Sequence, residues 1–274
     1  MKLRSLLFVP GDRPDRMKKA LRSGADALIL DLEDAVAPSR KAEARDAIAG
    51  FLADTDRVIP LLVRINPLNG GLAEADLEAI LPARPNGIML PKAEGAASIR
   101  ALAHRTDIPI LPIATETPAA IFALGSYAEV KDHLVGLTWG AEDLPAAIGA
   151  TAAREADGRY TAPIEMARSL ALFAAHAAGV PAIETVYPAF RDLEGLGAYA
   201  ARGRRDGFSG MMAIHPEQVA VINAAFTPSE AEIVRARAIV DAFAVEPGAG
   251  VLVVEGQMVD APHLAQAKRL LSSF

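Results

Sequence analysis

The stretch "ALILDLEDAV", residues 27–36, joins an apolar run to a group of carboxylates. Its first four residues have the continuous hydrophobicity of a strand that is buried on both faces of a parallel sheet. Asp31, Glu33 and Asp34 follow at once. Two unit charges about 4 Å apart repel by about 4 kcal/mol at an effective dielectric constant near 20. The three carboxylates must therefore either be open to water or lie beside cations.

Similar apolar runs recur along the chain, and helix-like segments separate them. One such segment starts at Pro14, and another has Ser39 as its expected N-cap. Eight strand–helix pairs predict an α/β fold, a (β/α)8 TIM barrel. A doubly wound open sheet is the alternative, because the number of strands cannot prove closure. The other seven runs lie at residues 5–9, 61–65, 87–91, 110–114, 134–139, 183–187 and 210–214.

The last part of the chain follows the eighth strand–helix pair. Residues 227–274 read as a helix capped at Thr227 or Ser229, a hairpin-like segment and a final helix. About fifty residues are too few to fold alone without staples. We therefore expect a catalytic barrel domain over 1–226 and a helical and hairpin extension over 227–274, which packs on the barrel and on a neighbouring subunit.

The composition excludes several classes of function. Of the 274 residues, 51% are hydrophobic, and the net charge is −6 without a long run of either sign. These values predict a globular protein whose main partner is neither nucleic acid nor a membrane. Cysteine is absent, which excludes disulfides, thiolate nucleophiles and thiolate metal sites. The apolar run near the N-terminus is too short for a signal peptide, so a cytoplasmic location is expected.

Charged and polar residues follow most of the apolar runs. In (β/α)8 enzymes the active site lies at the C-terminal ends of the strands. A guanidinium inside an apolar strand stays charged and needs anions around it. We therefore expect one charged barrel mouth built from several strands. Its members are Asp31, Glu33 and Asp34; Arg64 and Asn66; Lys92; Thr115 and Glu116; Glu142 and Asp143; Glu184 and Tyr187; and His215.

Glu116 and Asp143, on neighbouring strand ends, are the natural pair of ligands for one divalent cation. Hard oxygen ligands suit Mg²⁺, which usually takes one or two carboxylates and fills its other positions with water and substrate. Zinc is disfavoured, because cysteine is absent and the five histidines show no ligand spacing. The sequence therefore predicts a magnesium site.

The carboxylates at residues 31–34 are expected to accept hydrogen bonds from water around the metal and to pair with Arg64 or Lys92. Glu33 and Asp34 should matter more than Asp31, whose side chain the alternation of the strand turns away. Simpler roles are open for single members of the mouth. Asp34 can cap the next helix, Lys92 can pair with Glu94, Glu142 can face solvent, and His215 can contact the site or only orient the chain.

The motifs taken together resemble a known family. In order along residues 4 to about 270, they match the citrate lyase beta-subunit-like proteins of the HpcH/HpaI aldolase/citrate lyase family, which also holds malyl-CoA and citramalyl-CoA lyases. The motifs are "LLFVPGDRPDRMKKAL", "ALILDLEDAVAPSRKAEAR", "VRIN", "IMLPKAE", "ETP", "WGAEDL", "AIHPEQVAVINAAFTPS" and "EGQMVDAPHLAQA".

The resemblance implies a Mg²⁺-dependent barrel, typically a homotrimer, that breaks or forms a carbon–carbon bond next to an acyl thioester. It implies that Glu116 and Asp143 bind the metal and, with Glu142, the substrate. Arg64 matches the arginine that holds the 2-ketoacid. Asp260 matches an acid/base that reaches the active site of the adjacent subunit. Glu33 and Asp34 join Arg64 and Asp260 as candidate catalytic residues, and the residues that could bind CoA phosphates are Arg13, Arg16 and Lys18.

The expected function is that of an oxo-acid-lyase. It cleaves a 3-hydroxyacyl-CoA of the citramalyl-CoA or malyl-CoA type into acetyl-CoA and a 2-ketoacid. The alternatives are a citryl lyase beta subunit that acts on an acyl-carrier-protein thioester, a malyl-CoA thioesterase, a CoA-independent pyruvate aldolase, and a non-catalytic subunit of a lyase complex. Asp260 favours the self-contained CoA lyase.

Overall fold

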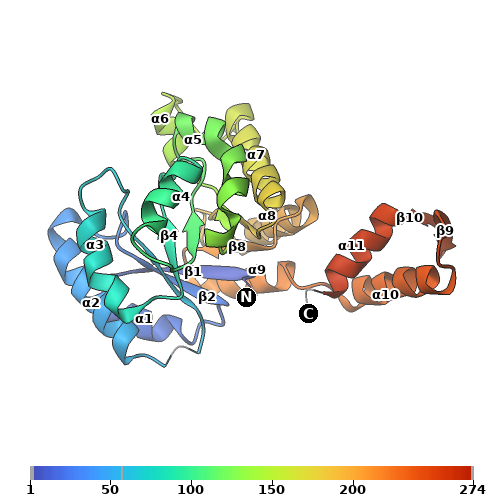
Figure 1. Cartoon of the computed structure of the whole chain (residues 1–274), viewed down its shortest axis with the longest axis horizontal. Helices are drawn as coiled ribbons and strands as arrows, with labels where there is room; N and C mark the ends of the chain where they lie inside the picture. The colour runs from blue at the N-terminus through green and yellow to red at the C-terminus, as the bar shows by residue number, and fades with distance from the viewer. Residues whose placement is uncertain (1–2, 57, 273–274) are drawn as a thin grey trace. The chain divides into compact units, whose positions relative to one another are not determined.

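The computed structural model describes residues 3–56 and 58–272 (Figure 1). The chain divides into two compact units, and the boundary falls between Phe226 and Thr227. The first unit contains eight parallel strands with helices around them. These strands are β1 (Ser5–Pro10), β2 (Ala27–Asp31), β3 (Leu61–Arg64), β4 (Gly87–Leu90), β5 (Ile110–Pro112), β6 (Leu137–Thr138), β7 (Ala182–Glu184) and β8 (Gly210–Ala213).

The strands form a barrel. They pair in the order β5-β4-β3-β2-β1-β8-β7-β6. The two ends of this order are also joined, because the amide of Val135 donates to the carbonyl of Ile110 at 3.0 Å and the amide of Ala114 donates to that of Thr138 at 2.9 Å. A sheet whose edges meet in this way is a barrel and not an open doubly wound sheet. The predicted fold is confirmed.

Alternation along the strands divides the apolar residues into two layers. One layer fills the barrel and includes Leu6, Ile29 and Leu62. The other lies between the barrel and its helices and includes Leu7, Leu28 and Leu30. Neighbouring residues of a strand point to opposite faces of the sheet. The same alternation therefore decides which charged residues at the strand ends face the barrel mouth.

The helices of the barrel unit follow the strands, as expected. Ser39 is not the N-cap of the second one, because Pro38 starts a short 3-10 turn and α2 begins only after Arg40. The helices are α1 (Pro14–Ala20), α2 (Lys41–Asp54), α3 (Ala73–Ile80), α4 (Ala96–Ala103), α5 (Pro118–Ala123), α6 (Asp143–Ala147), α7 (Ala162–Ala178), α8 (Leu193–Asp206) and α9 (Pro216–Ala225), and the 3-10 turns are η1 (Pro38–Arg40), η2 (Leu81–Ala83) and η3 (Leu124–His133).

The second unit is a helix, a hairpin and a helix: α10 (Glu230–Val245), β9 (Val251–Val254), β10 (Gln257–Asp260) and α11 (Ala261–Leu271). Ser229, and not Thr227, caps α10, through a capping box with Glu232. The unit has a small apolar core of its own, which includes Ile239, Val254 and Val259. Among the helices of residues 3–56 and 58–272, none has both the length and the apolar character needed to cross a bilayer.

Candidate active site

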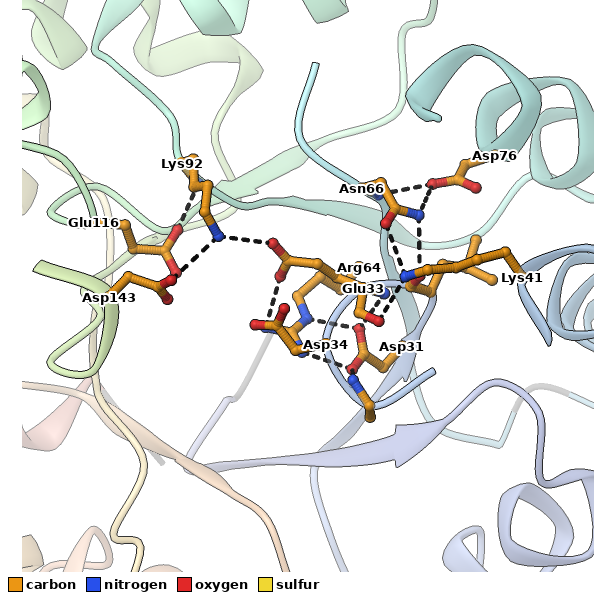
Figure 2. A network of polar contacts seen from close by, with 12 residues as sticks. Asp31, Glu33, Asp34, Lys41, Arg64, Asn66, Asp76, Lys92, Glu116 and Asp143 are labelled. Carbon is orange, nitrogen blue, oxygen red and sulfur yellow. Dashed lines mark hydrogen bonds and ion pairs between the residues drawn. The ribbon is translucent and has the colours of Figure 1, made fainter. Parts of the chain in front are cut away.

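Asp31 and Arg64 form the most firmly held ion pair at the barrel mouth (Figure 2). They are opposite each other in the register of β2 and β3. Arg64 Nε donates to Asp31 Oδ1 at 2.7 Å, and Nη2 donates to Oδ2 at 2.6 Å. The backbone amides of Glu33 and Ala35 also donate to the Asp31 carboxylate, at 2.8 and 3.0 Å. Asp31 is fully buried.

The expectation that strand alternation turns Asp31 away from the mouth was wrong. Ile29, two residues earlier on the same strand, lies inside the barrel. Residues two apart share a face of a strand, so Asp31 points inward as well. Arg64 points inward by the same argument from Leu62. The carboxylate that was expected to matter less is the one that binds the arginine most directly.

Glu33 and Asp34 are held differently from each other. Glu33 is buried, and its Oε2 lies 2.9 Å from Arg64 Nη1. Burial raises the pKa of Glu33, although Arg64 and Lys92 oppose the shift. Asp34 is exposed, and its carboxylate is 3.9 Å from Arg64. The carboxylates of residues 31–34 therefore lie beside cations, and Asp34 is the one that faces solvent.

Arg64 itself is nearly covered. Its guanidinium stacks 4.8 Å from the centre of the Phe8 ring. Burial lowers the pKa of Arg64, but the hydrogen bonds and charge of Asp31 more than offset this, so the pKa lies above its ordinary value. The arginine is a permanent cation in a fixed position.

A buried lysine braces the loop that carries Glu33. Lys41 Nζ donates to the carbonyls of Leu32 and Glu33 at 2.6 and 2.7 Å and to Asn66 Oδ1 at 2.9 Å. Asn66 in turn donates its side-chain amide to Asp76 Oδ2 at 2.7 Å. Figure 2 shows this network on the side of the loop away from Glu116. All three ammonium hydrogens of Lys41 thus have acceptors.

The sequence interpretation missed Lys41. A signal was available, because Ala44, Ile48, Phe51 and Leu52 form the buried stripe of α2. Residue 41 extends that stripe by one turn, since residues three and four apart share a helix face. A lysine on the apolar face of a helix needs a buried acceptor, and strand-end carbonyls are the acceptors within reach here.

Glu116, which follows β5, is buried and belongs to a crowded carboxylate pair. Its Oε2 accepts the backbone amide of Lys92 at 2.5 Å. Burial raises the pKa of Glu116 to about 8, and the charges of Glu33 and Asp143 add to this rise. The neighbouring Gly140 leaves room for it, because a Cβ at that position would come within 2.9 Å of Glu116 Cγ.

Asp143, the first residue of α6, lies next to Glu116 in Figure 2. Lys92 Nζ is 3.4 Å from Asp143 Oδ1 and 3.1 Å from Glu33 Oε1. Burial lowers the pKa of Lys92, but Glu33 and Glu116 more than offset this, so the lysine stays charged. Lys92 therefore pairs with Glu33 and Asp143, and the alternative pairing with Glu94 is not the one observed.

A cleft of about 420 Å³ lies between Arg64 and the pair formed by Glu116 and Asp143. Arg64 and Asp31 lie on its wall together with the acidic pair formed by Glu116 and Asp143. The remaining wall is mostly apolar, as in typical small-molecule sites. The further lining residues are Phe8, Pro10, Asp34, Ala35, Ile113, Gly140, Ala141, Glu142, Thr185, Val186, Met212 and Ile214.

The donor set of the cleft fits Mg²⁺. Within residues 3–56 and 58–272, no group of three or more His, Asp or Glu side chains has the arrangement of a complete metal cage. Mg²⁺ rarely uses such a cage, because it keeps several waters and takes one or two carboxylates. Glu116 and Asp143 are the two carboxylates that could hold the ion. Burial, together with the charges of Glu33 and Asp143, raises the pKa of Glu116, and a bound cation would favour its ionised form.

Several expected members of the mouth do not line the cleft, and Glu184, Tyr187 and His215 are among them. Glu184 points outward, because Ile183 on the same short strand fills the barrel. It accepts hydrogen bonds from Trp139 Nε1 at 2.6 Å and from Arg168 Nε at 2.8 Å. His215 is the N-cap of α9, where its Nδ1 accepts the amide of Glu217. The Tyr187 hydroxyl donates to Asp192 Oδ2 at 2.7 Å. All three residues have structural contacts instead of contacts in the cleft.

The three basic residues considered for CoA phosphates lie at the start of the barrel unit. Arg13 is the N-cap of α1, and Arg16 and Lys18 lie on this helix. All three are exposed. Lys18 also lines a shallow hollow with Lys19 and Arg22. Their side chains are accessible to a phosphate group, and they are equally accessible to bulk water.

Asp260 belongs to the second unit and is the N-cap of α11. His263 Nδ1 lies 2.5 Å from its Oδ1, and this hydrogen bond lowers the pKa of Asp260. In the hairpin Asp260 pairs with Val251, and Met258 pairs with Val253. Directly paired residues point to the same face of a hairpin. Asp260 therefore shares its face with three exposed apolar side chains.

Comparison with known proteins gives a consistent family. The model of the HpcH/HpaI aldolase/citrate lyase family matches residues 4–216. The chain is 37% identical over 277 residues to a (3S)-malyl-CoA thioesterase of Cereibacter sphaeroides, covering 98% of this chain and 93% of that protein. It is 35% identical over 292 residues to the mitochondrial citramalyl-CoA lyase of Rattus norvegicus, covering 98% and 85%.

A solved structure agrees with these relatives. Protein CitE from Mycobacterium tuberculosis, in complex with magnesium, acetoacetate and coenzyme A, matches with a TM-score of 0.86 and 38% sequence identity. The match covers 99% of this chain and 98% of that chain.

Proposed function

The chain belongs to the HpcH/HpaI aldolase/citrate lyase family, and we propose that it is a magnesium-dependent lyase that cleaves a 3-hydroxyacyl-CoA of the citramalyl-CoA or malyl-CoA type. The products are acetyl-CoA and a 2-ketoacid. One observation carries this proposal: a fixed arginine, Arg64, and a carboxylate pair, Glu116 and Asp143, line the same cleft. The carboxylate of a 2-ketoacid can pair with Arg64. Two oxygens of the same ketoacid can bind a cation that Glu116 and Asp143 hold.

Arg64 binds the ketoacid part of the substrate. Asp31 accepts two of the five N–H bonds of its guanidinium, and Glu33 forms an ion pair with Nη1. The remaining N–H bonds stay available for a carboxylate or for an oxygen that gains charge as the carbon–carbon bond breaks. Because the ion pairs fix Arg64 before substrate arrives, little reorganisation is needed during the reaction.

Glu116 and Asp143 would hold Mg²⁺. The ion, when bound, acidifies the substrate hydroxyl and stabilises the carbonyl oxygen of the departing ketoacid. The known complex of the relative CitE with magnesium and coenzyme A supports this assignment of cofactor and substrate class. Glu142 lines the same cleft, which supports its proposed contact with the substrate. Arg13, Arg16 and Lys18 remain candidates for the CoA phosphates.

Asp260 is proposed as the acid/base. Its lowered pKa keeps it ionised at neutral pH. This is the form that removes a proton from the thioester methyl group in the condensation direction, and cleavage returns the proton to that carbon. Asp260 lies on a hairpin face with the exposed side chains Val251, Val253 and Met258. An exposed apolar face of this kind supports docking on a neighbouring subunit, as in a homotrimer.

A thioesterase is the second candidate, because a (3S)-malyl-CoA thioesterase is among the relatives. A thioesterase would use the same cleft, but in its last step water would attack the carbonyl carbon of the thioester. Three alternatives stay predictions, because no contact among the described residues favours them. They are an acyl-carrier-protein-linked subunit, a CoA-independent aldolase and a non-catalytic subunit.

Product analysis tests the proposal. Purified protein is incubated with citramalyl-CoA or malyl-CoA and Mg²⁺, and the products are separated by chromatography and identified by mass. A lyase gives acetyl-CoA with pyruvate or glyoxylate. A thioesterase gives free CoA and the hydroxyacid, which would contradict the proposal. The E116Q variant is the control for uncatalysed breakdown of the thioester.

A further inference from the structure

Lys92 has an unusual backbone conformation. Its φ is +50°, in the left-handed region that residues with side chains seldom adopt. Glycine would occupy this position without strain. A lysine here therefore combines a disfavoured backbone with a side chain that has a specific set of contacts.

The two ends of Lys92 contact the two carboxylates assigned to the metal. Its backbone amide donates to Glu116 Oε2 at 2.5 Å, and its Nζ lies 3.4 Å from Asp143 Oδ1. The same Nζ lies 3.1 Å from Glu33 Oε1, and Glu33 contacts Arg64. Figure 2 shows Lys92 between these groups. One residue thus links the carboxylate pair to the arginine side of the cleft.

We propose that Lys92 is a positioning residue of the metal site, whose amide fixes Glu116 and whose ammonium is the counter-ion of Asp143 and Glu33 until a divalent cation binds. This inference rests on the proposed function, because it takes Glu116 and Asp143 as the metal ligands. Neighbouring carboxylates without a counter-ion repel one another strongly in a partly buried site. The ammonium removes that repulsion in the metal-free protein.

The same ammonium must weaken metal binding. It competes with the cation for Asp143, and it repels a second positive charge beside the same carboxylate. Lys92 thus orders the carboxylates before the metal binds, and it lowers the affinity of the site for the metal. A residue that only supported the fold would not oppose Mg²⁺ in this way.

Titration of Mg²⁺ into the substrate-free protein tests this assignment by calorimetry. K92M removes the ammonium and keeps the backbone amide, so we expect Mg²⁺ to bind about tenfold more tightly. K92G also keeps the amide and fits the backbone, so it should match K92M. K92R keeps the charge and should stay near the wild type. K131M, at an exposed lysine on η3, controls for the loss of a lysine.

Thermal unfolding gives a second readout. In chelator, K92M should unfold at a lower temperature than K131M, because its carboxylates repel one another. Saturating Mg²⁺ should remove most of this difference, whereas a purely structural role of Lys92 would leave it unchanged.

Unchanged or weaker Mg²⁺ binding in both K92M and K92G would overturn the inference. A wild-type protein that binds Mg²⁺ normally in that case would leave the proposed function intact. If the wild type itself binds no Mg²⁺, the proposed metal site fails, and the role of Lys92 fails with it.

Discussion

Asp31 and Asp34 are three residues apart and differ sharply in how firmly the protein holds them. Asp31 is buried and accepts two hydrogen bonds from Arg64, whereas Asp34 is exposed. Breaking a buried ion pair typically costs 3–5 kcal/mol, because the remaining charge loses its partner. D31N should therefore lower the free energy of unfolding by about 3 kcal/mol and reduce kcat/KM at least about 100-fold.

D34N is the matched control for that prediction. The same chemical change at an exposed site should alter the free energy of unfolding by less than about 0.5 kcal/mol. Urea unfolding of both variants, with steady-state kinetics, makes the comparison. If D31N and D34N lost equal amounts of unfolding free energy and of kcat/KM, the bidentate pair would not be what fixes Arg64.

Glu116 gives a prediction about metal dependence. E116Q keeps the shape of the side chain and removes the charge that a hard cation prefers. The variant should lose measurable Mg²⁺ binding in calorimetry and nearly all ketoacid release. E142Q, a change on the same wall of the cleft, should still bind Mg²⁺. Normal Mg²⁺ binding by E116Q would remove this residue from the metal site.

Glu116 also predicts how metal binding depends on pH. Its pKa of about 8 in the metal-free fold lies above the value of 4.5 for an ordinary glutamate. Stability from the protonated form is fully present below pH 4.5 and is lost as the pH rises through 8. Mg²⁺ needs the ionised form, so its apparent affinity should rise about tenfold per pH unit from pH 6 to pH 8 and then level off.

Calorimetry or the shift of Tm with Mg²⁺ at several pH values measures this dependence. E142Q should show the same slope as the wild type. A Mg²⁺ affinity that is flat between pH 6 and pH 8 would mean that Glu116 is ionised before the metal binds.

At the scale of elements, the first turn of α2 supports the loop after β2. Lys41 donates to three acceptors there, on Leu32, Glu33 and Asn66. K41M keeps most of the volume and removes the ammonium. Asn66 Oδ1 then loses its donor, whereas the Leu32 carbonyl keeps the Asn66 amide and the Glu33 carbonyl keeps the Val36 amide. We expect a loss of about 2 kcal/mol in the free energy of unfolding, from one unsatisfied buried acceptor and the loss of charge-assisted hydrogen bonds. Urea unfolding measures it, with K19M on the exposed side of α1 as control. A loss in K41M no larger than in K19M would show that the brace is unimportant.

The strands of the barrel could be predicted because their apolar runs are nearly continuous and helix signals separate them. The position of charges at the strand ends followed from the same runs. Side-chain direction was harder. Counting from Ile29 places Asp31 inside the mouth, and counting from Ile183 places Glu184 outside it, but both counts need the buried face to be known first.

Ser39 shows a second limit. A serine before a helical run is a good N-cap, yet Pro38 starts a 3-10 turn there and shifts the start of α2. The pairing of Lys92 with Glu33 was expected, and the buried stripe of α2 gave a signal for Lys41 that was not used. The contacts of Lys92 with Asp143 and of Lys41 with Asn66 were not predicted, because they join segments that are far apart along the chain.

At the scale of the whole molecule, the proposal requires Asp260 of one subunit to act in the cleft of another. D260N should reduce the rate about 10²- to 10⁴-fold, the range for a general acid or base. A mixture of D260N and E116Q tests the arrangement more directly. After subunit exchange, about a quarter of the clefts in a randomly mixed ring combine an intact metal site with an intact Asp260 from the neighbour.

Activity of the mixture should therefore rise well above that of either variant alone. Native mass spectrometry would establish that subunits have exchanged and would give the oligomeric state. Exchange without recovered activity would contradict catalysis across the subunit boundary. It would leave the metal site at Glu116 and Asp143 untouched.

The release of 2-ketoacid from citramalyl-CoA and malyl-CoA, with Mg²⁺ and with chelator, tests the central claim most directly. Phenylhydrazine traps the pyruvate or glyoxylate and reports its rate of formation. We predict steady release from at least one substrate with Mg²⁺, none with chelator, and none from E116Q. A folded, Mg²⁺-loaded protein that releases no ketoacid from either thioester would contradict the assignment of this cleft to carbon–carbon cleavage.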